Sequence, residues 1–388
     1  MLYYLSNSLK NKYDFIITGS GASGLILAYR MIHDDYYQDK SILLIDKDQK
    51  DSNDRTWCFW EKGQGEWDDI LEKSWKNIAF KSAVHSETIS IQPYTYKMIR
   101  SADFYKKIHA ELNQNSNFSM VYDTVETIEE IEDVVKVQGR KEAYQGGKVL
   151  NSIVFDNAYR NQRKYPVLKQ HFLGWFIKTE EDYFDDQTAT FMDFTVKQQN
   201  NTRFMYILPM SKKEALFEYT LFSEDLLTTE EYESAIKKYL EEKGITKYTI
   251  VEKENGIIPM TCYKFWEHNS KNVLNLGTVG GWSKASTGYT FMNIGKKTKE
   301  LVDFLKTGKD LNTFHKTSRF WYYDLLLLDV LHKENGIGSK VFGYLFKRNK
   351  THQIFKFLDE ETSFPEEFRI MASIPPWRFI KALLGRIF

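Results

Sequence analysis

The sequence predicts an α/β protein: a Rossmann-type nucleotide-binding domain interrupted by an antiparallel β-sheet and followed by a helical carboxyl-terminal region. Three features of the 388 residues predict this class. A glycine-rich turn joins a short apolar strand to a helix near the amino terminus, strand-like segments fill the middle of the chain, and the last part has helical periodicity.

The amino-terminal elements follow the pattern of a βαβ unit. Residues 14–18 (DFIIT) are typical of a strand and lead into the glycine-rich turn 19–24, after which the chain is apolar and helix-forming. Residues 41–45 (SILLI) predict a second buried strand that ends at Asp46, twenty-two residues beyond Gly24. This separation is the one expected within a dinucleotide-binding unit.

The middle of the chain predicts an inserted sheet. The polar segment 48–54 leads into an aromatic block at 57–60 (WCFW), where we expect a loop over a site. A strand at 98–100 and a helix that begins at Ser101 follow. From about residue 171 to 223 the chain is a run of strands (HFLGWFI, TATFMDF, RFMYILP and ALFEYTLF), which indicates an antiparallel sheet.

The remaining elements return to helix. An amphipathic helix is predicted over 228–240, and a strand at 273–276 runs into a second glycine-rich turn at 277–281. Helical stretches follow at 289–305 and 320–331. We therefore divide the chain into three parts. A discontinuous Rossmann-type nucleotide-binding domain covers residues 1–165 and 250–305, a sheet domain for the substrate covers 166–249, and a helical region covers 306–388.

Composition excludes several classes of function. Lys plus Arg and Asp plus Glu both number 53, so no net basic charge favours nucleic-acid binding. Cys58 and Cys262 are far apart and outside any C-x-x-C or histidine-rich context, so we expect neither a disulfide framework nor a metal site. Aromatic residues make up 15% of the chain, which favours a large apolar ligand site or a membrane-facing surface.

No segment is expected to act as an export signal or to span a membrane. The first twelve residues contain Lys10 and Lys12, and no cleavable apolar segment follows them. The longest uncharged run, 15–29, is broken by three glycines. It is shorter than the roughly 18 apolar residues that a spanning helix needs. We therefore expect a cytoplasmic protein.

The first glycine-rich turn matches the G-x-G-x-x-G dinucleotide fingerprint. In this motif Gly19 permits the sharp turn, Gly21 lets the backbone approach a pyrophosphate, and Gly24 allows close contact between helix and strand. The carboxylate at the end of the second strand would accept hydrogen bonds from the adenosine ribose. A turn without a ligand is the alternative, and the strand–turn–helix context favours a dinucleotide. The predicted contacts are Gly19, Gly21, Ala22, Gly24, Asp46 and Lys47.

The fingerprint alone is shared by NAD and FAD proteins. The second glycine-rich turn, far along the chain and again after an apolar strand, favours FAD, because extended FAD domains often close in this way near the flavin. Gly277 and Gly288 are the predicted contacts there, and a loop that needs positive φ is the alternative. Arg55 and Arg100 are candidates for the flavin phosphates or ring carbonyls, or for ordinary surface ion pairs.

Seven short motifs follow one another between about residues 14 and 294. They are 53–60 (NDRTWCFW), 154–156 (VFD), 192–194 (MDF), 203–209 (RFMYILP), 216–220 (LFEYT), 256–260 (GIIPM) and 285–291 (ASTGYTF). Together these motifs resemble the lycopene cyclase family of FAD-dependent carotenoid enzymes, specifically the bacterial lycopene β-cyclases. The residues beyond 294 match less distinctly.

The resemblance implies a cyclisation of lycopene with no net oxidation, first to γ-carotene and then to β-carotene. An acid protonates the terminal C1=C2 double bond, the neighbouring C5=C6 double bond attacks the cation, and loss of a proton leaves a β-ionone ring. The resemblance also implies that FAD acts in its reduced form without being consumed, with NAD(P)H as the external reductant. Lycopene and other linear carotenoids are the expected partners.

Two carboxylic acids are the candidate catalytic residues. The resemblance implies that Glu218 is the proton donor or the stabiliser of the cation. Strand alternation puts Leu216, Thr220 and Phe222 on its face and supplies no neighbouring positive charge, so desolvation favours the protonated acid. An edge-strand glutamate that faces water is the alternative. Asp193, in another apolar strand, is expected to orient Glu218 or a water molecule, or else to serve as a structural acid.

Aromatic residues and the carboxyl-terminal end complete the prediction. Five aromatic side chains are expected to flank a cationic intermediate or to pack in the core: Trp57, Trp60, Tyr206, Trp282 and Tyr289. Residues 377–388 form a helix with one apolar, aromatic half and one basic half, which is typical of a helix in a membrane interface. A helix docked on the protein's own core is the alternative. We expect peripheral association with the inner face of the membrane.

Two other functions fit the same pattern. A redox flavoenzyme, such as a polyprenyl or geranylgeranyl reductase or an aromatic hydroxylase, shares the predicted fold, which by itself does not decide the reaction. A nucleotide-binding protein that carries carotenoids without catalysis is the third interpretation. The mass of the product distinguishes the two enzymatic functions: cyclisation leaves the mass unchanged, whereas reduction adds hydrogen and hydroxylation adds oxygen.

Overall fold

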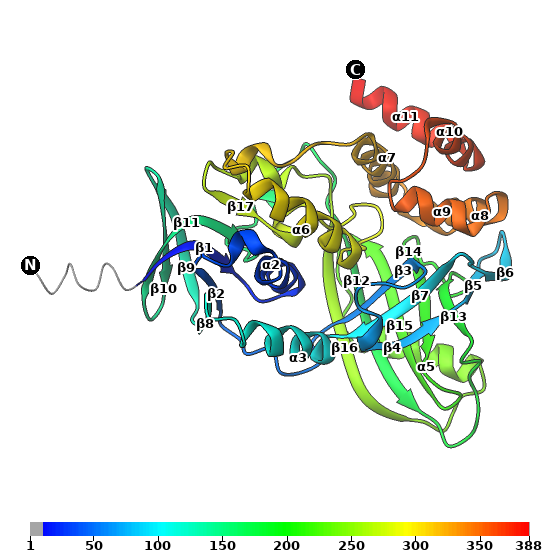
Figure 1. Ribbon diagram of the computed structural model, residues 1–388. Helices are drawn as coiled ribbons and strands as arrows, with labels where there is room; N and C mark the ends of the chain where they lie inside the picture. Colours follow the sequence, from blue (N-terminus) through cyan, green and yellow to red (C-terminus); the bar gives the residue numbers. More distant parts are fainter. Residues whose placement is uncertain (1–10, 388) are drawn as a thin grey trace, which may run out of the picture.

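The computed structural model describes residues 11–387 and contains the predicted nucleotide-binding sheet (Figure 1). Strand β1 lies parallel between β2 and β11, and the other edge of β11 is shared by β10 and by β17. The strands of this sheet are β8 (Phe118–Tyr122), β2 (Ile42–Asp46), β1 (Lys12–Thr18), β11 (Ala143–Asn151), β10 (Val134–Gly139), β9 (Val125–Ile131) and β17 (Val273–Asn275). The first ten residues, where no export signal is expected, lie outside the described range.

Three helices pack with this sheet around one apolar core. They are α2 (Ala22–Ile32), α3 (Ser101–Leu112) and α6 (Phe291–Leu305). The central strands β1 and β2 are covered on both faces, so their apolar side chains are buried. Ile17 of β1 and Leu44 of β2 pack in one cluster with Leu25, Phe104 and Leu301 of the three helices. This arrangement carries the glycine-rich turn at the end of β1.

The second sheet is almost wholly antiparallel. Its order is β16 (Thr249–Met260), β12 (Leu168–Lys178), β15 (Glu214–Ser223), β14 (Thr202–Pro209), β13 (Thr188–Asp193), β5 (Asn77–Lys81) and β6 (Ser86–Ser90), with only β13 and β5 parallel. The sheet therefore extends beyond the expected range 166–249, since β5 and β6 come before it and most of β16 comes after it. The alternation of apolar residues predicts a strand, but it does not predict which sheet the strand joins. Helix α5 (Thr229–Glu242) covers one face, and the other face lines a cavity.

A small sheet joins the two larger units. It consists of β3 (Thr56–Lys62), β7 (Tyr94–Arg100) and β4 (Leu71–Trp75), so the aromatic block at 57–60 is a strand. Phe59 stacks on Phe291 of α6 at 5.3 Å between ring centroids, whereas the next residue, Trp60, stacks on Phe355 at 4.5 Å. Strand alternation thus sends neighbouring aromatic side chains into two different cores.

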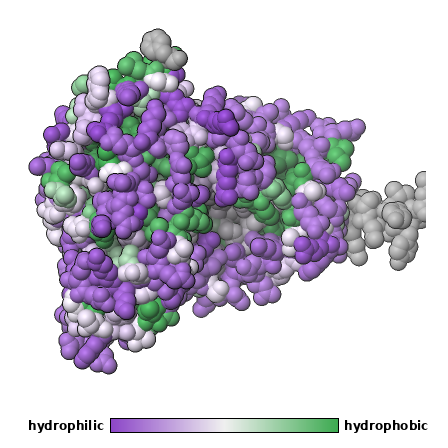
Figure 2. All heavy atoms as spheres, turned by 180° about the vertical axis from the view of Figure 1, so that it is seen from behind, coloured by the Kyte–Doolittle hydropathy of each residue, from purple (hydrophilic) through white to green (hydrophobic). Residues whose placement is uncertain are grey.

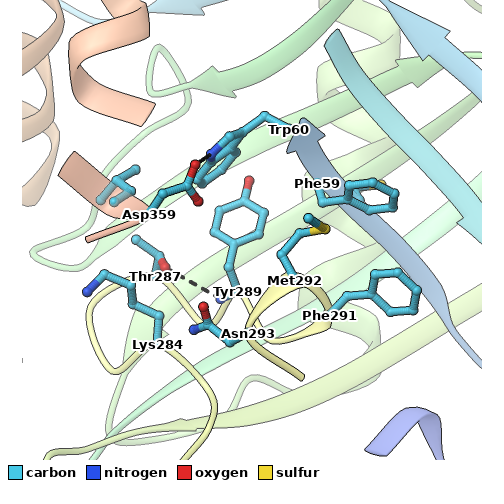
Figure 3. A pocket seen from close by; sticks show the side chains of 11 residues that line it. Phe59, Trp60, Lys284, Thr287, Tyr289, Phe291, Met292, Asn293 and Asp359 are labelled. Carbon is cyan, nitrogen blue, oxygen red and sulfur yellow. Dashed lines mark hydrogen bonds between the residues drawn. The ribbon is translucent and has the colours of Figure 1, made fainter. Parts of the chain in front are cut away.

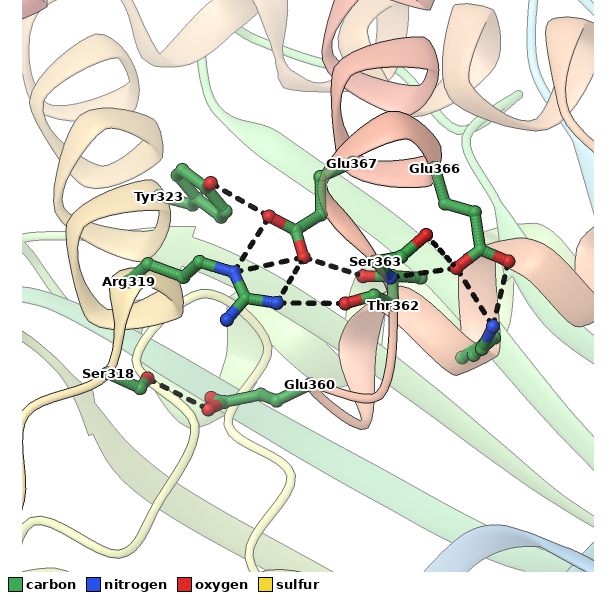
Figure 4. Close-up of polar contacts among 9 residues, drawn as sticks. Ser318, Arg319, Tyr323, Glu360, Thr362, Ser363, Glu366 and Glu367 are labelled. Atoms are coloured by element: carbon green, nitrogen blue, oxygen red, sulfur yellow. Dashed lines mark hydrogen bonds and ion pairs between the residues drawn. The ribbon is translucent and has the colours of Figure 1, made fainter.

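The carboxyl-terminal region is helical, as predicted, and packs against the second sheet (Figure 1). Its helices are α7 (Arg319–Lys333), α8 (Gly338–Arg348), α9 (Thr351–Leu358), α10 (Phe364–Ser373) and α11 (Pro376–Ile387). Figure 4 shows how α7 and α10 are joined: the Arg319 guanidinium donates to both oxygens of the buried Glu367 carboxylate, which also accepts from Tyr323 at 2.9 Å. Within residues 11–387, no helix is both long enough and apolar enough to cross a membrane.

Candidate functional site

A cavity of about 480 Å³ lies between the glycine-rich turn and the antiparallel sheet. We call it the central cavity; among the residues that line it are Gly21, Ala22, Ser23, Arg55, Trp57, Tyr206, Glu218, Glu254, Gly288 and Tyr289. The fold therefore brings predicted cofactor residues and the predicted acid to one space, although they are far apart in the sequence. No group of three or more metal-ligating side chains gathers anywhere in residues 11–387.

The glycine-rich turn fits a dinucleotide. Gly19 has a φ of +93°, and a Cβ there would lie 2.2 Å from Ser152 Oγ, while a Cβ at Gly24 would lie 2.0 Å from the Gly19 carbonyl oxygen. Both positions are therefore dictated by the fold. A Cβ at Gly21 would meet nothing within 4 Å, so this glycine leaves open space at the amino-terminal end of α2. Backbone N–H groups without helical partners point outward there and suit a phosphate.

The acid at the end of β2 lies beside this turn. Asp46 is buried, and its carboxylate accepts hydrogen bonds from the backbone N–H of Ser20 at 2.5 Å and of Asp48 at 2.9 Å. It therefore stabilises the turn itself. Lys47 is exposed, and neither residue lines the central cavity.

The two predicted arginines differ in position. Arg55 lines the central cavity. Arg100 is buried outside it: Nη1 donates to Thr56 Oγ1 at 3.2 Å, Nη2 donates to Glu252 Oε1 at 2.5 Å, and the guanidinium lies 4.1 Å from the centre of the Phe176 ring. Its donors are thus directed at protein groups in an ion pair, which was the alternative to a flavin contact, although Arg100 is buried and not on the surface.

The second glycine-rich turn packs against the first. Gly277 has a φ of +58°, and a Cβ there would lie 2.2 Å from Ser23 Oγ in the first turn of α2. Gly288, with a φ of +72°, lines the central cavity beside Gln170, whose buried Oε1 has no hydrogen-bond donor among the described residues. The late glycines therefore belong to the same site as the early ones.

Glu218 projects from β15 into the central cavity, away from bulk solvent. Burial raises the pKa of its carboxyl to about 8; the Thr220 hydroxyl, which donates to Oε1 at 2.7 Å, opposes the rise, and the nearby Glu254 charge adds to it. The acid therefore holds its proton at neutral pH, as the apolar strand pattern predicted.

A second carboxylate, Glu254 on β16, also lines the cavity, and the sequence analysis missed it. Strand register sets Tyr206, Glu218, Gly174 and Glu254 in one row across four neighbouring strands. Thr56 holds Glu254, because its backbone N–H donates to Oε1 at 3.0 Å and its hydroxyl to Oε2 at 2.5 Å. The only signal in the sequence was a glutamate two residues before the motif at 256–260.

Aromatic side chains form one wall of the cavity. The hydroxyls of Tyr96, Tyr206 and Tyr289 are hydrogen-bonded in a chain, with Tyr96 in contact with both of the others. Figure 3 shows Tyr289 beside Trp60, whose indole N–H donates to Asp359 at 2.9 Å. Trp57, Tyr206 and Tyr289 line the central cavity, whereas Trp60 and Trp282 pack behind it in the core.

Asp193 lies elsewhere. It is fully buried and accepts hydrogen bonds from Tyr239 of α5 at 2.7 Å and from the backbone N–H of Thr195 at 2.9 Å. The pairing of β13 shifts register between Thr190 and Asp193, so the carboxylate faces α5 rather than the central cavity. The structure therefore does not bring Asp193 together with Glu218.

Comparison with known sequences identifies the family. The family model described as lycopene cyclase protein matches residues 14–384. The chain belongs to the lycopene cyclase family. It is 24% identical to a lycopene β-cyclase of Pantoea ananas and 25% identical to one of Paracoccus sp., over 72% of this chain and 71% and 70% of those proteins. The resemblance inferred from the seven motifs is confirmed.

Comparison with solved structures identifies the fold. A geranylgeranyl bacteriochlorophyll reductase-like protein from Thermoplasma acidophilum has a TM-score of 0.62 at 11% identity, covering 97% of this family member and 99% of that chain. A flavin-dependent brominase has a TM-score of 0.60 at 12% identity, with 97% and 99% covered. At such identities the likeness concerns the fold, and it confirms the predicted class of FAD-binding fold with an inserted sheet.

Proposed function

We propose that this lycopene cyclase family member is a lycopene β-cyclase that closes the ends of lycopene into β-ionone rings, giving γ-carotene and then β-carotene. The observation that carries the proposal is Glu218: a carboxylic acid that faces an internal cavity and holds its proton at neutral pH. Protonation of an alkene needs such an acid. The relatives named lycopene β-cyclase support the same reaction.

Reduced FAD is the proposed cofactor, and NAD(P)H its external reductant. The open space at Gly21 and the amino-terminal end of α2 suit the pyrophosphate, and Arg55 and Gly288 line the cavity beyond it. Ala22, Gly277 and Asp46 shape the turn around this space. Bound reduced flavin supplies electrostatic stabilisation or acid–base chemistry without being consumed.

The protein's own groups account for the first steps. The Thr220 hydroxyl donates to Oε1 of Glu218, so Oε2 carries the proton that passes to C2 of the terminal double bond. The positive charge that develops at C1 is attracted to the electron-rich faces of Tyr206 and Tyr289. The apolar wall keeps water from the cation, so that attack by C5=C6 closes the ring.

The variant Glu218→Gln tests this proposal. It keeps the size of the side chain and removes the acid, so FAD binding should persist while the rate of cyclisation falls about 10²–10⁴-fold. Glu214→Gln, a change at a half-buried glutamate outside the central cavity on the same strand, is the matched control. The assay uses lycopene in liposomes with chemically reduced FAD. Full activity of Glu218→Gln would contradict the proposal.

The fold likeness to a reductase-like protein makes a redox flavoenzyme the second candidate. Product mass separates the two, because cyclisation leaves the mass unchanged and reduction adds two hydrogens. In deuterated water the cyclase should place one deuterium at ring carbon C2. A product heavier by two hydrogens in ordinary water would replace the cyclase with a reductase.

Peripheral association with the inner face of the membrane belongs to the same proposal, because the hydrocarbon substrate resides in lipid. Helix α11 supports it. Trp377 and Ile387 of this helix are 73% and 63% exposed, which leaves an apolar surface outside the core.

A further inference from the structure

The central cavity contains two carboxylic side chains that face each other across a glycine. Glu218 of β15 and Glu254 of β16 are both in register with Gly174 of the intervening strand β12. Residues directly opposite one another in an antiparallel sheet point to the same face. Gly174 places no side chain between the two carboxyl groups, and both carboxyl groups line the central cavity, while Leu216 of β15 packs against the glycine. A Cβ at Gly174 would lie 2.8 Å from Leu216 and 3.5 Å from the Glu218 Cβ.

The two side chains are bound differently. Glu218 accepts one hydrogen bond, from Thr220, and holds its proton. Both oxygens of Glu254 accept a hydrogen bond from Thr56, one from its backbone N–H and one from its hydroxyl. An ionised carboxylate only accepts hydrogen bonds, whereas a carboxylic acid also donates one, so a donor at each oxygen suits the ionised form. The row thus pairs an acid with a base.

Arg100 stabilises this arrangement from behind the cavity. Its Nη1 donates to the Thr56 hydroxyl oxygen at 3.2 Å, which leaves the hydroxyl proton directed at Glu254. Its Nη2 is anchored by Glu252, two residues before Glu254 on the same strand. Arg100 and Thr56 are therefore positioning residues for Glu254.

We infer that Glu254 is the base that takes the C6 proton as the ring forms; this inference rests on the proposed cyclase function. Glu218 gives its proton to C2, and the electron pair of C5=C6 forms the C1–C6 bond, which leaves the positive charge at C5. The C6–H proton passes to Glu254, and the electrons of that bond become the C5=C6 double bond. One proton has then moved from Glu218 to Glu254; Glu254 releases a proton to solvent and Glu218 takes one from solvent, which restores both groups without an oxidant or a reductant.

The test is Glu254→Gln in the FAD-loaded, chemically reduced protein, with lycopene in phosphatidylcholine liposomes and deuterated water. Addition of deuterium at C2 should persist, because Glu218 is intact. Formation of β-rings should fall about 10²–10⁴-fold, and the residual product should lose its proton from another carbon, such as C4, which gives a displaced ring double bond. A residue with only a structural role would not change the position of this double bond. FAD titration should match that of the unchanged protein.

Two further variants keep the inference testable if Glu254→Gln folds poorly. Thr56→Val removes the hydroxyl at nearly constant size and should displace the double bond in the same direction, whereas Thr56→Ser should restore the normal ring. Unchanged rate and ring type in Glu254→Gln, or unchanged ring type in Thr56→Val, would overturn the inference while the proposed function stands. If the unchanged protein itself forms no ring, the proposed function fails instead.

Discussion

At the scale of single residues, the neighbourhood of Glu218 sets its acidity. Alternation along β15 points the side chain into the cavity, where burial raises its pKa to about 8. The hydrogen bond from Thr220 is the main opposing influence, since donors to a carboxylate favour its ionised form. One strand position thereby converts an ordinary glutamate into an acid that is protonated under neutral conditions.

This acidity predicts a pH profile for cyclisation. The reaction needs protonated Glu218, so the rate should be lost as pH rises through about 8, the pKa of this group. Thr220→Val removes the hydrogen bond that lowers the pKa and should move the decline to higher pH. Initial rates of ring formation measure both effects, and FAD affinity measured over the same range is the control. A rate that stays constant well above this pH would contradict the assignment.

At the scale of elements, α11 attaches to the protein through its basic side. Arg386 forms an ion pair with Asp329 at 2.6 Å and Arg378 one with Glu334 at 2.7 Å, while Ala382 is buried. The apolar half predicted by the helical wheel therefore faces outward: Trp377, Ile380, Leu383, Leu384 and Ile387 are exposed, as are Phe364 and Phe368 of α10. In Figure 2 some hydrophobic residues are visible at the top of the molecule, where the chain ends, among hydrophilic ones.

This orientation predicts how the helix contributes to membrane binding. The double variant Trp377→Glu with Leu383→Glu should reduce co-sedimentation with liposomes, because charged groups are costly in the apolar part of an interface. FAD binding and thermal stability should not change, since both side chains are exposed. Lys238→Glu on α5, also exposed, is the matched control. Unchanged co-sedimentation of the double variant would show that α11 is not the anchor.

At the scale of the whole molecule, the central cavity lies where three separate parts of the fold meet. The glycine-rich turn belongs to the nucleotide-binding sheet, Glu218 to the antiparallel sheet, and Thr56 to the small sheet between them. A cofactor bound in this space would contact all three units. Its binding is therefore coupled to the stability of the entire fold.

FAD should accordingly raise the free energy of unfolding. At one hundred times its dissociation constant the gain is about 2.7 kcal/mol, measurable as a higher melting temperature. Gly21→Val should abolish this rise and change the ligand-free stability by less than about 1 kcal/mol, because a side chain at Gly21 meets only open space. Gly24→Ala is the contrasting variant, since its Cβ would clash with Gly19 and destabilise the ligand-free fold itself. Equal FAD-induced shifts in Gly21→Val and the unchanged protein would contradict the cofactor site.

The sequence by itself determined the α/β class, the turn between β1 and α2, the family and the raised pKa of the Glu218 carboxyl. All of these depend on local spacing: glycines at fixed intervals, alternation along a strand, and short motifs in a fixed order. The apolar neighbours of Glu218 along its own strand predicted a raised pKa, and burial is the largest cause of the rise in the folded protein.

Only the tertiary structure decided which side chains share the cavity. Glu254 joins Glu218 through the register of three strands, Asp193 is turned toward α5 by a shift in the pairing of β13, and Arg100 is drawn to Glu252 and Thr56. The alternation of residues along a strand predicts which side chains share a face, but it does not predict which segments pack against that face. That choice depends on pairings between segments distant in the sequence, and these are set by packing of the whole chain.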